Sequence, residues 1–104
     1  MAPQLFTIKK RATFVHIRDK GVFIRSKNIN VQKLLNQDLD GKIGVGYTAT
    51  KKIGNAVKRN KAKRIMRELA KKILIKGKTN TYYVLIAKLS ILDTKFKTLL
   101  EEME

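Results

Sequence analysis

Residues 51–68 read KKIGNAVKRNKAKRIMRE and say more about the fold than any other stretch of the chain. Basic side chains recur throughout this stretch, and between Lys51 and Lys78 there are twelve Lys or Arg residues and one acid, Glu68. Residues 51–78 therefore hold half of the 24 basic residues of the chain. Charge of one sign at this density repels itself unless a polyanion neutralises it. The segment predicts a nucleic-acid-binding surface on a small folded domain.

The same segment predicts a long helix with two unlike faces. We expect a helix from about Asn55, a favourable N-cap residue, to about Lys76, where Gly77 is a typical C-terminal stop. At about 100° per residue, an apolar stripe forms on one side from Ala62, Ile65, Met66, Leu69 and Ile73. The opposite side carries what we call the cationic stripe: Asn60, Arg64, Arg67 and Lys71. Such a helix can bury one face and present the other to a polyanion.

Three segments read as strands. Alternation of apolar and polar residues predicts strands over 27–35 and 42–49. Residues 81–87 are apolar on both faces, which is typical of a central strand. Gly44 and Gly46 leave one face of the second strand bare, so that a helix or a ligand backbone can lie close against it.

Two shorter helices and a turn complete the expected order. We expect one helix over 9–20 that stops at Gly21, and one over 93–104 that Asp93 caps. Acidic residues lie near the C-terminal end of the last helix, where the helix dipole disfavours them. Residues 36–41 contain Asp-Gly and predict a hairpin turn. The order helix, strand, strand, helix, strand, helix predicts an α/β (α+β) fold, a two-layer sandwich of one sheet with packed helices.

Length and composition limit the class of protein. At 104 residues and 43% hydrophobic content, we expect one domain over 1–104 with one core. A formal net charge of +16 favours partners rich in phosphate. The absence of cysteine excludes disulfides and is consistent with a reducing cytoplasm. No signal-peptide region or membrane-spanning run is present, and Pro3 belongs to an expected extended tail, so we predict a cytoplasmic protein without a membrane partner.

The residues that could carry chemistry are sparse. His16 is the only histidine, and in a short amphipathic helix we expect it to be structural or exposed. Asp38 and Asp40 resemble part of a calcium loop, but the other ligands are absent and a turn explains them. Glu68 is expected to form an ion pair with Arg64, Lys71 or Lys72 on its own helix. The sequence thus predicts a binding protein with no catalytic residue or metal site of its own.

Phe14 is the aromatic residue most suited to nucleic acid. It lies close to Lys10, Arg11 and Arg18, and an aromatic among cations suits a single strand, although core packing is an equal alternative. The other aromatics considered are expected in the core: Tyr47, Tyr82, Tyr83 and Phe96. The residues before Asn55 read as a strand and a loop, which argues against a helix-turn-helix and against DNA as the partner.

Residues 51–64, KKIGNAVKRNKAKR, resemble the hallmark motif of the protein subunit of bacterial ribonuclease P. Ile8-Lys9-Lys10 followed by Phe14, VGYTAT at 45–50 and YVLIA at 83–87 resemble further segments of that family. The resemblance covers nearly the whole chain. It implies an α/β sandwich like domain 2 of ribosomal protein S5, with a left-handed crossover that runs against the usual rule.

The resemblance also implies a function. The family enzyme is a ribonucleoprotein that removes the 5′ leader from precursor tRNA, and its catalyst is the RNA subunit with bound Mg²⁺. The expected partners are the catalytic RNA and precursor tRNA. On the residues alone, the alternative is a ribosomal or chaperone-like RNA-binding protein without a linked reaction.

Family roles carry over to two sets of residues. The catalytic-RNA set is Lys51, Lys52, Asn55, Arg59, Asn60, Lys61, Lys63, Arg64 and Arg67. The leader set, in a cleft between the first helix and the sheet, is Lys10, Arg11, Phe14 and Arg18. Lys61 replaces a family arginine and loses its planar fork. Arg18 replaces a frequent second aromatic, so an ionic contact is expected there in place of stacking.

Overall fold

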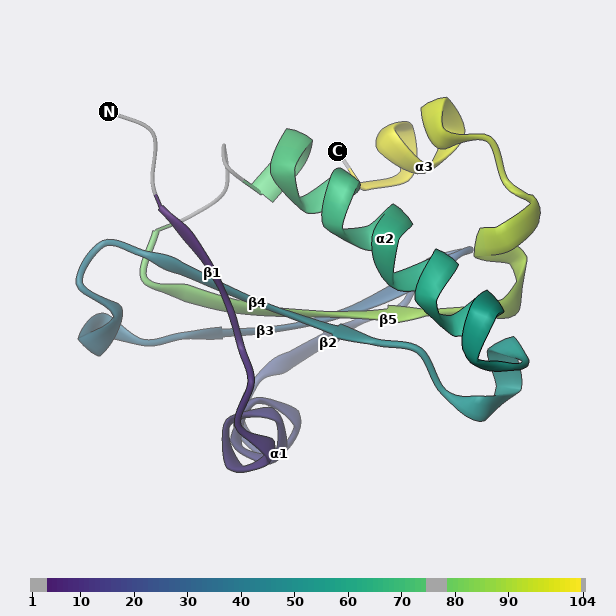
Figure 1. Ribbon diagram of the computed structural model, residues 1–104. Helices are drawn as coiled ribbons and strands as arrows, with labels where there is room; N and C mark the ends of the chain where they lie inside the picture. The colour runs from purple at the N-terminus through teal and green to yellow at the C-terminus, as the bar shows by residue number, and fades with distance from the viewer. Residues whose placement is uncertain (1–3, 75–78, 104) are drawn as a thin grey trace.

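In the part of the chain that the structure describes, five strands form one mixed sheet, with α1 on one face and α2 and α3 on the other (Figure 1). The computed structural model describes residues 4–74 and 79–103. The elements are β1 (Leu5–Thr7), α1 (Arg11–Lys20), β2 (Val22–Ile24), β3 (Ile29–Leu35), β4 (Ile43–Thr48), α2 (Ala56–Ile73), β5 (Thr81–Ala87) and α3 (Phe96–Met103), with 3-10 turns η1 (Gln37–Leu39), η2 (Lys51–Ile53) and η4 (Leu89–Asp93). The expectations for Pro3, Lys76 and Gly77 lie outside the described residues.

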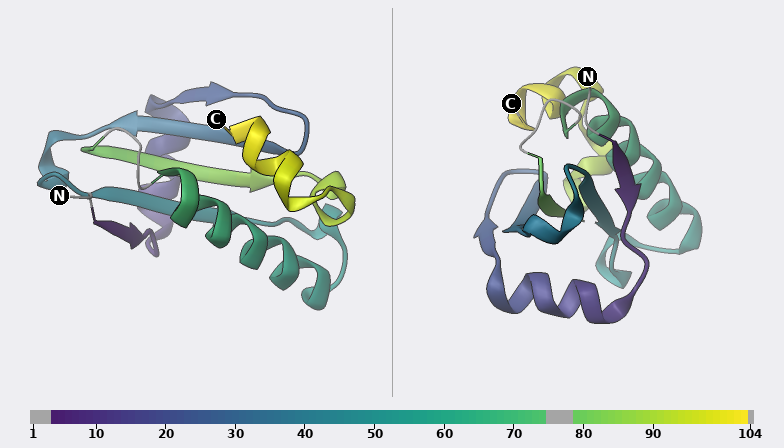
Figure 2. Two further views of the ribbon diagram at one scale, coloured as in Figure 1. Left: turned by 90° about the horizontal axis from the view of Figure 1, so that it is seen from above. Right: turned by 90° about the vertical axis from the view of Figure 1, so that its left-hand side faces the viewer.

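The strand order is β1-β4-β5-β3-β2. β5 is parallel to β4 and antiparallel to β3, so the prediction of a central strand over 81–87 is confirmed. β1 adds in parallel to β4 at one edge, and β2 adds antiparallel to β3 at the other (Figure 2). The α/β class with a single sheet is confirmed, whereas helices on both faces replace the expected two-layer arrangement.

The predicted hairpin at 36–41 is wrong, because β5 lies between the two strands that this turn connects. Asn80, just before β5, bridges them: its amide nitrogen donates to the Lys42 carbonyl at 2.9 Å, and its carbonyl accepts from the Asn36 amide at 2.7 Å. The Asn80 side-chain oxygen also accepts from the Gly41 amide at 2.8 Å. The segment still turns sharply, with Asp40 in the left-handed region, but without a two-strand ladder.

The larger core lies between the sheet and α2 with α3. Ala62, Met66 and Leu69 are fully buried there, while Ile65 and Ile73 are half-buried, which confirms the apolar stripe of α2. A smaller cluster under α1 contains Ile8, Ile17 and Val84. The sheet thus anchors α1 through one face and α2 and α3 through the other.

The bare face of β4 receives α1 at Gly46, so a helix, and not a ligand backbone, covers it there. A Cβ on Gly46 would lie 2.4 Å from the Phe14 ring, and one on Gly44 would lie 2.8 Å from the rings of Phe6 and Tyr82. Phe14 is half-buried at this contact. Glycine at 46 is therefore what allows the aromatic of α1 to rest directly on the sheet.

The last helix begins at Phe96, so the expected cap at Asp93 is wrong. Asp93 ends η4, and the following residue Thr94 is extended, which delays the helix. The Thr94 hydroxyl instead has two acceptors within reach of its one proton, the Ser90 carbonyl at 2.7 Å and the Asn28 side-chain oxygen at 3.1 Å.

The hydrogen bonds of Glu102 explain why an acidic residue is tolerated near the C-terminal end of this helix. Its carboxylate accepts hydrogen bonds from the Ser26 hydroxyl at 2.7 Å, the Asn28 amide at 2.9 Å, the Asn28 side chain at 2.6 Å and the Ile29 amide at 3.2 Å. Burial by itself raises the pKa of Glu102, but these four hydrogen bonds together lower that pKa below its usual value. The contacts fasten α3 to the start of β3 and outweigh the unfavourable helix dipole.

Candidate nucleic-acid interface

Two side-chain hydrogen bonds and a glycine hold the loop before α2 in place. The Asn55 side-chain oxygen accepts from the Lys58 amide at 3.0 Å, so the predicted N-cap is confirmed. Gly54 has φ +133°, a conformation that favours glycine. The Arg59 guanidinium donates to the Gly54 carbonyl at 2.7 Å and holds this turn against the helix. The exposed side chains of η2 are thereby fixed close to the start of α2.

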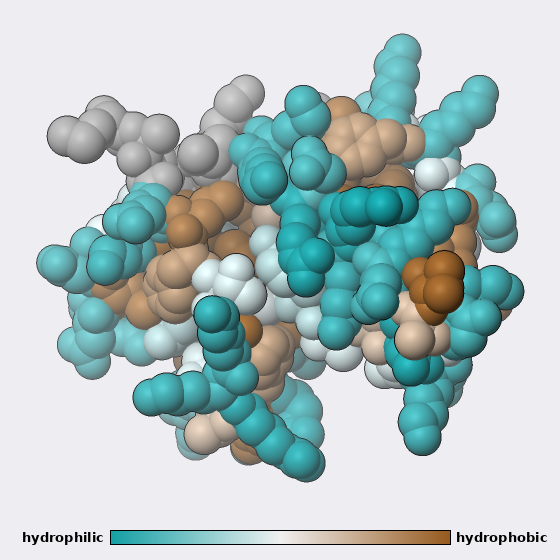
Figure 3. Space-filling model, viewed as in Figure 1, coloured by the Kyte–Doolittle hydropathy of each residue, from teal (hydrophilic) through white to brown (hydrophobic). Residues whose placement is uncertain are grey.

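The cationic stripe of α2 faces solvent, as predicted (Figure 3). Within residues 4–74 and 79–103, no carboxylate lies within ion-pair distance of Arg64 or Arg67. Glu68 pairs instead with Lys71 at 3.7 Å, which confirms its expected intrahelical role. The stripe therefore keeps guanidinium groups available for phosphate, and the apolar stripe anchors the same helix to the sheet.

Tyr47 on β4 contacts Arg67 of the cationic stripe. The Arg67 guanidinium lies 5.7 Å from the centre of the Tyr47 ring, within range of a cation–π contact. Burial raises the pKa of the Tyr47 hydroxyl, and the nearby Arg67 charge opposes that rise. The phenol thus stays neutral at physiological pH, and Arg67 is positioned without being neutralised. The prediction that Tyr47 packs on the core is confirmed.

The catalytic-RNA set is not uniform in this structure. Its exposed members lie along η2 and the outer side of α2: Lys51, Lys52, Asn55, Asn60, Lys61, Arg64 and Arg67. Arg59 and Lys63 are half-buried, and Arg59 already holds Gly54. The structure thus brings most of the set onto one surface and gives Arg59 a structural contact as well.

A second candidate surface is a hollow of about 290 Å³ between α1 and the sheet, which we call the α1 groove. Arg11, Phe14 and Arg18 of the leader set come together there, with Val15 beside them. The opposite wall consists of Gln32, Thr48, Val84 and Ile86. Cations therefore flank a largely apolar floor, an arrangement that suits a single strand of nucleic acid.

Lys10 does not join this groove. It lines a separate hollow of about 230 Å³, together with Phe6 and Tyr82 among others. Of the two alternatives for Phe14, core packing is confirmed, because its ring packs on Gly46, whereas stacking on a base stays a prediction for the part of the ring that lines the α1 groove. His16 is exposed, which is one of the two placements expected for it.

Gln32 and Thr48 line the α1 groove but were not predicted from the sequence to do so. The signal for Thr48 was available, because it lies two residues after Gly46 and shares the bare face of β4. Gln32 could be placed only once β3 was known to lie beside β5, where Gln32 pairs with Val84. Nothing in local periodicity predicts that neighbour.

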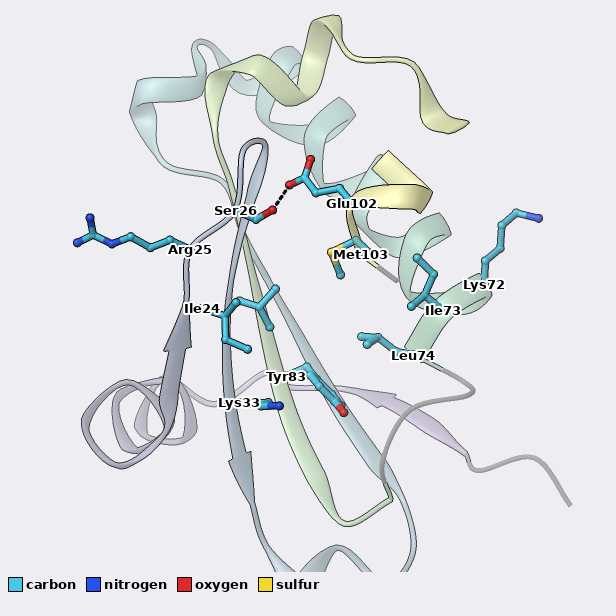
Figure 4. Close-up of a pocket in the computed structure, with 11 residues that line it drawn as sticks. Ile24, Arg25, Ser26, Lys33, Lys72, Ile73, Leu74, Tyr83, Glu102 and Met103 are labelled. Carbon is cyan, nitrogen blue, oxygen red and sulfur yellow. Dashed lines mark hydrogen bonds between the residues drawn. The ribbon is translucent and has the colours of Figure 1, made fainter. Parts of the chain in front are cut away.

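A larger hollow, of about 670 Å³, lies elsewhere, between the ends of α2 and α3 and the β2–β3 side of the sheet (Figure 4). No residue of either predicted set lines it. Its carboxylate, Glu102, is held by Ser26, and the Arg25 side chain points away from the other lining residues. Volume alone therefore does not identify the functional surface.

The side chains on these surfaces do not fit a metal ion. Mg²⁺ binds carboxylate and carbonyl oxygens, whereas both candidate surfaces present ammonium and guanidinium groups. Across the described ranges, no group of three or more His, Asp or Glu residues could hold a metal. No described helix is long and apolar enough to cross a bilayer.

The fold and its surfaces define a small basic α/β protein suited to a phosphate-rich partner. The sequence profile of the family Ribonuclease P matches residues 2–104. The chain therefore belongs to the ribonuclease P protein family.

Relatives agree with this assignment. The chain is 40% identical over 68 residues to the "Ribonuclease P protein component" of Gluconacetobacter diazotrophicus, covering 65% of this chain and 58% of that protein. It is 38% identical over 82 residues to that of Caulobacter vibrioides, covering 78% and 54%. The chain thus spans little more than half the length of these two relatives. For Symbiobacterium thermophilum the identity is 30% over 99 residues, covering 95% and 85%.

Solved structures show the same fold. The Staphylococcus aureus RNase P protein superposes with a TM-score of 0.80 at 29% identity, covering 93% of this chain and 87% of that chain. The RNase P protein from Thermotoga maritima has a TM-score of 0.81 at 22% identity, covering 93% and 90%. At the latter identity the likeness concerns the fold alone.

Proposed function

We propose that this chain is the protein subunit of the ribonuclease P ribonucleoprotein and assists RNA-catalysed removal of the 5′ leader from precursor tRNA. The observation that carries the proposal is the exposed cationic stripe of α2, whose arginines Arg64 and Arg67 have no carboxylate partner among the described residues. Membership in the ribonuclease P protein family indicates that the polyanion bound by this stripe is RNA.

In this proposal the catalytic-RNA set binds the phosphates of the catalytic RNA. Lys and Arg contacts to phosphate give affinity and position without reading sequence. Lys51 and Lys52 contribute from η2, and Arg64 and Arg67 from α2. Asn55 keeps its side-chain nitrogen available, because only its oxygen is used by the cap.

The α1 groove receives the single-stranded leader. A base stacks on the exposed part of Phe14, while Arg11 and Arg18 hold phosphates on either side. The side chain of Thr48 lies at the end of the groove from which β4 continues into η2, so the leader reaches the groove from the catalytic-RNA surface.

Magnesium is held by the RNA in this scheme, since the basic surfaces of the protein do not fit it. Bound there, the ion supplies an activated water and stabilises the leaving oxygen. The residues of this chain lower the repulsion between the phosphates of catalyst and substrate, and they orient the leader. We further propose a single domain over 1–104, a cytoplasmic location and no DNA partner.

The crossover from β4 through α2 to β5 is proposed to be left-handed. Figure 2 supports this, because β4 and β5 run in the same direction with α2 on the viewer's side in its left-hand view. When the strands are turned to point upward, β5 lies to the left of β4. The packing that places α2 over these two strands is compatible with that hand.

The test is reconstitution. The purified chain is added to a bacterial ribonuclease P RNA and a precursor tRNA, and cleavage at the mature 5′ end is measured. We expect stimulated cleavage at that position. Binding to RNA without any stimulation would favour a ribosomal or chaperone-like protein instead.

A further inference from the structure

Phe23 is an aromatic residue without a place in the core. It lies on the edge strand β2 and is 46% exposed. Its pairing partner across the strands is Gln32, which in turn pairs with Val84, and Val84 pairs with Gly46. Residues paired in this way project from the same face of the sheet. Phe23 therefore extends the row that begins where Phe14 rests on Gly46 and that includes two residues of the α1 groove.

Arg25 accompanies this ring. Its guanidinium lies 5.8 Å from the centre of the Phe23 ring. Figure 4 shows the Arg25 side chain directed away from the hollow on the other face, into which Ile24 projects. The two side chains thus combine an exposed π-face with a cation, the pair of features that binds successive nucleotides of a single strand.

The α1 groove is directed toward this pair. Arg11, Phe14 and Arg18 recur at helical spacing and follow one side of α1 along the groove. Figure 2 (right) shows α1 running along one face of the sheet toward β2, which begins two residues after α1 ends. Arg18, in the last turn of α1, therefore lies toward β2, whereas Thr48 marks the opposite end of the groove, next to η2.

We propose that the RNA groove continues past α1 onto β2, where Phe23 and Arg25 form a shelf for a leader nucleotide beyond those at Phe14. This rests on the proposed function. Phe14 and Phe23 are separated by three strand spacings, about 14 Å, which leaves room for several nucleotides at a rise of roughly 3.4 Å per stacked base. Since the leader enters from the η2 side, the shelf meets the nucleotides farthest from the cleavage site.

The experiment uses the reconstituted holoenzyme and two precursor tRNAs, one with a leader too short to pass Phe14 and one several nucleotides longer. Phe23→Ala should weaken binding of the long-leader substrate about fivefold to tenfold and leave the short-leader substrate unchanged. Phe23→Tyr should restore tight binding. Val22→Ala is the matched control, because Val22 is 59% exposed on the same strand but faces the other side of the sheet.

The outcomes separate the shelf from the function on which it depends. If Phe23→Ala binds both substrates as tightly as the unaltered chain, or weakens both equally, the shelf is refuted. A thermal unfolding curve for each variant distinguishes a weaker RNA-binding surface from a destabilised fold. If the unaltered chain itself stimulates no cleavage of either substrate, the proposed function fails first, whatever Phe23 does.

Discussion

The Phe14 ring reaches the sheet only because Gly46 has no side chain. A Cβ at this position would lie 2.4 Å from the ring, and the rest of α1 follows Phe14. One residue thus sets both the packing of the smaller core and the depth of the α1 groove. The glycine pattern was visible in the sequence, whereas the identity of the group that covers it was not.

Gly46→Ala should therefore lower the free energy of unfolding by about 1–3 kcal/mol through overpacking. Chemical denaturation of the purified variant measures this change. In a Phe14→Ala background the same substitution should cost less, because the atom that clashes has been removed. Equal costs in both backgrounds would show that the Phe14 ring is not what excludes a side chain at 46.

Protonation of Glu102 should lower the stability of the fold. Its folded pKa is lowered, so its contribution is present above the usual carboxyl value of 4.5 and disappears as the pH falls through the folded pKa. Glu102→Gln places an amide group opposite the donors of Ser26, Asn28 and Ile29, and should cost about 1–3 kcal/mol at neutral pH.

Denaturation at neutral and acid pH tests this account of Glu102. The difference in stability between the unaltered chain and Glu102→Gln should shrink toward acid pH. Glu101→Gln, an exposed neighbour, is the control and should have little effect at either pH. A constant difference across the pH range would mean that the charge of Glu102 is not what fastens α3.

At the scale of the element, Asn55 joins a structural role to a predicted binding role. Asn55→Ala should lower the free energy of unfolding by about 0.5–2 kcal/mol, because the Lys58 amide loses its partner. Asn55→Asp should keep the cap and the stability while weakening RNA binding, since it adds a negative charge to the RNA surface. Unfolding and RNA titration of both variants separate the two roles; if Asn55→Asp binds RNA normally, Asn55 is a cap alone.

The elements that depend on local pattern were predictable. The cap at Asn55, the two faces of α2 and the central strand over 81–87 follow from spacing within one segment. β1 and β2 were missed, because three residues are too few to show alternation and their pairing partners lie far along the chain. The hairpin error has the same origin, since only the insertion of β5 decides that β3 and β4 do not pair.

Of the candidate site, the sequence supplied the cations and Phe14, but not their neighbours. Arg11, Phe14 and Arg18 were grouped by their nearness in the sequence and by the family resemblance, and their helical spacing places them on one side of α1. Gln32 joins them through strand order alone, so it could not be foreseen. Lys10 lines a different hollow because it precedes α1, where helical spacing no longer says which way a side chain points.

At the scale of the whole molecule, the net charge of +16 should act mainly by screening phosphate repulsion. Stimulation of cleavage by this chain should therefore be greatest at low magnesium and low salt, where the RNA has fewest other counterions. A magnesium series with and without the protein measures this. Equal cleavage rates with and without the protein at every magnesium concentration would show that the chain does not act by screening phosphate repulsion.

The central claim is that one face of α2 binds RNA phosphates while the other anchors the helix to the sheet. The most direct measurement is RNA affinity against salt concentration for the Arg64→Ala/Arg67→Ala double variant. The control is Lys95→Ala/Lys97→Ala, which removes the same charge from exposed positions at the start of α3. The account predicts weaker binding and a log–log slope that is shallower by about 0.7–0.9 for each phosphate no longer bound, with the control near the unaltered chain. An unchanged slope for the arginine variant, or an equal change in the control, would contradict it.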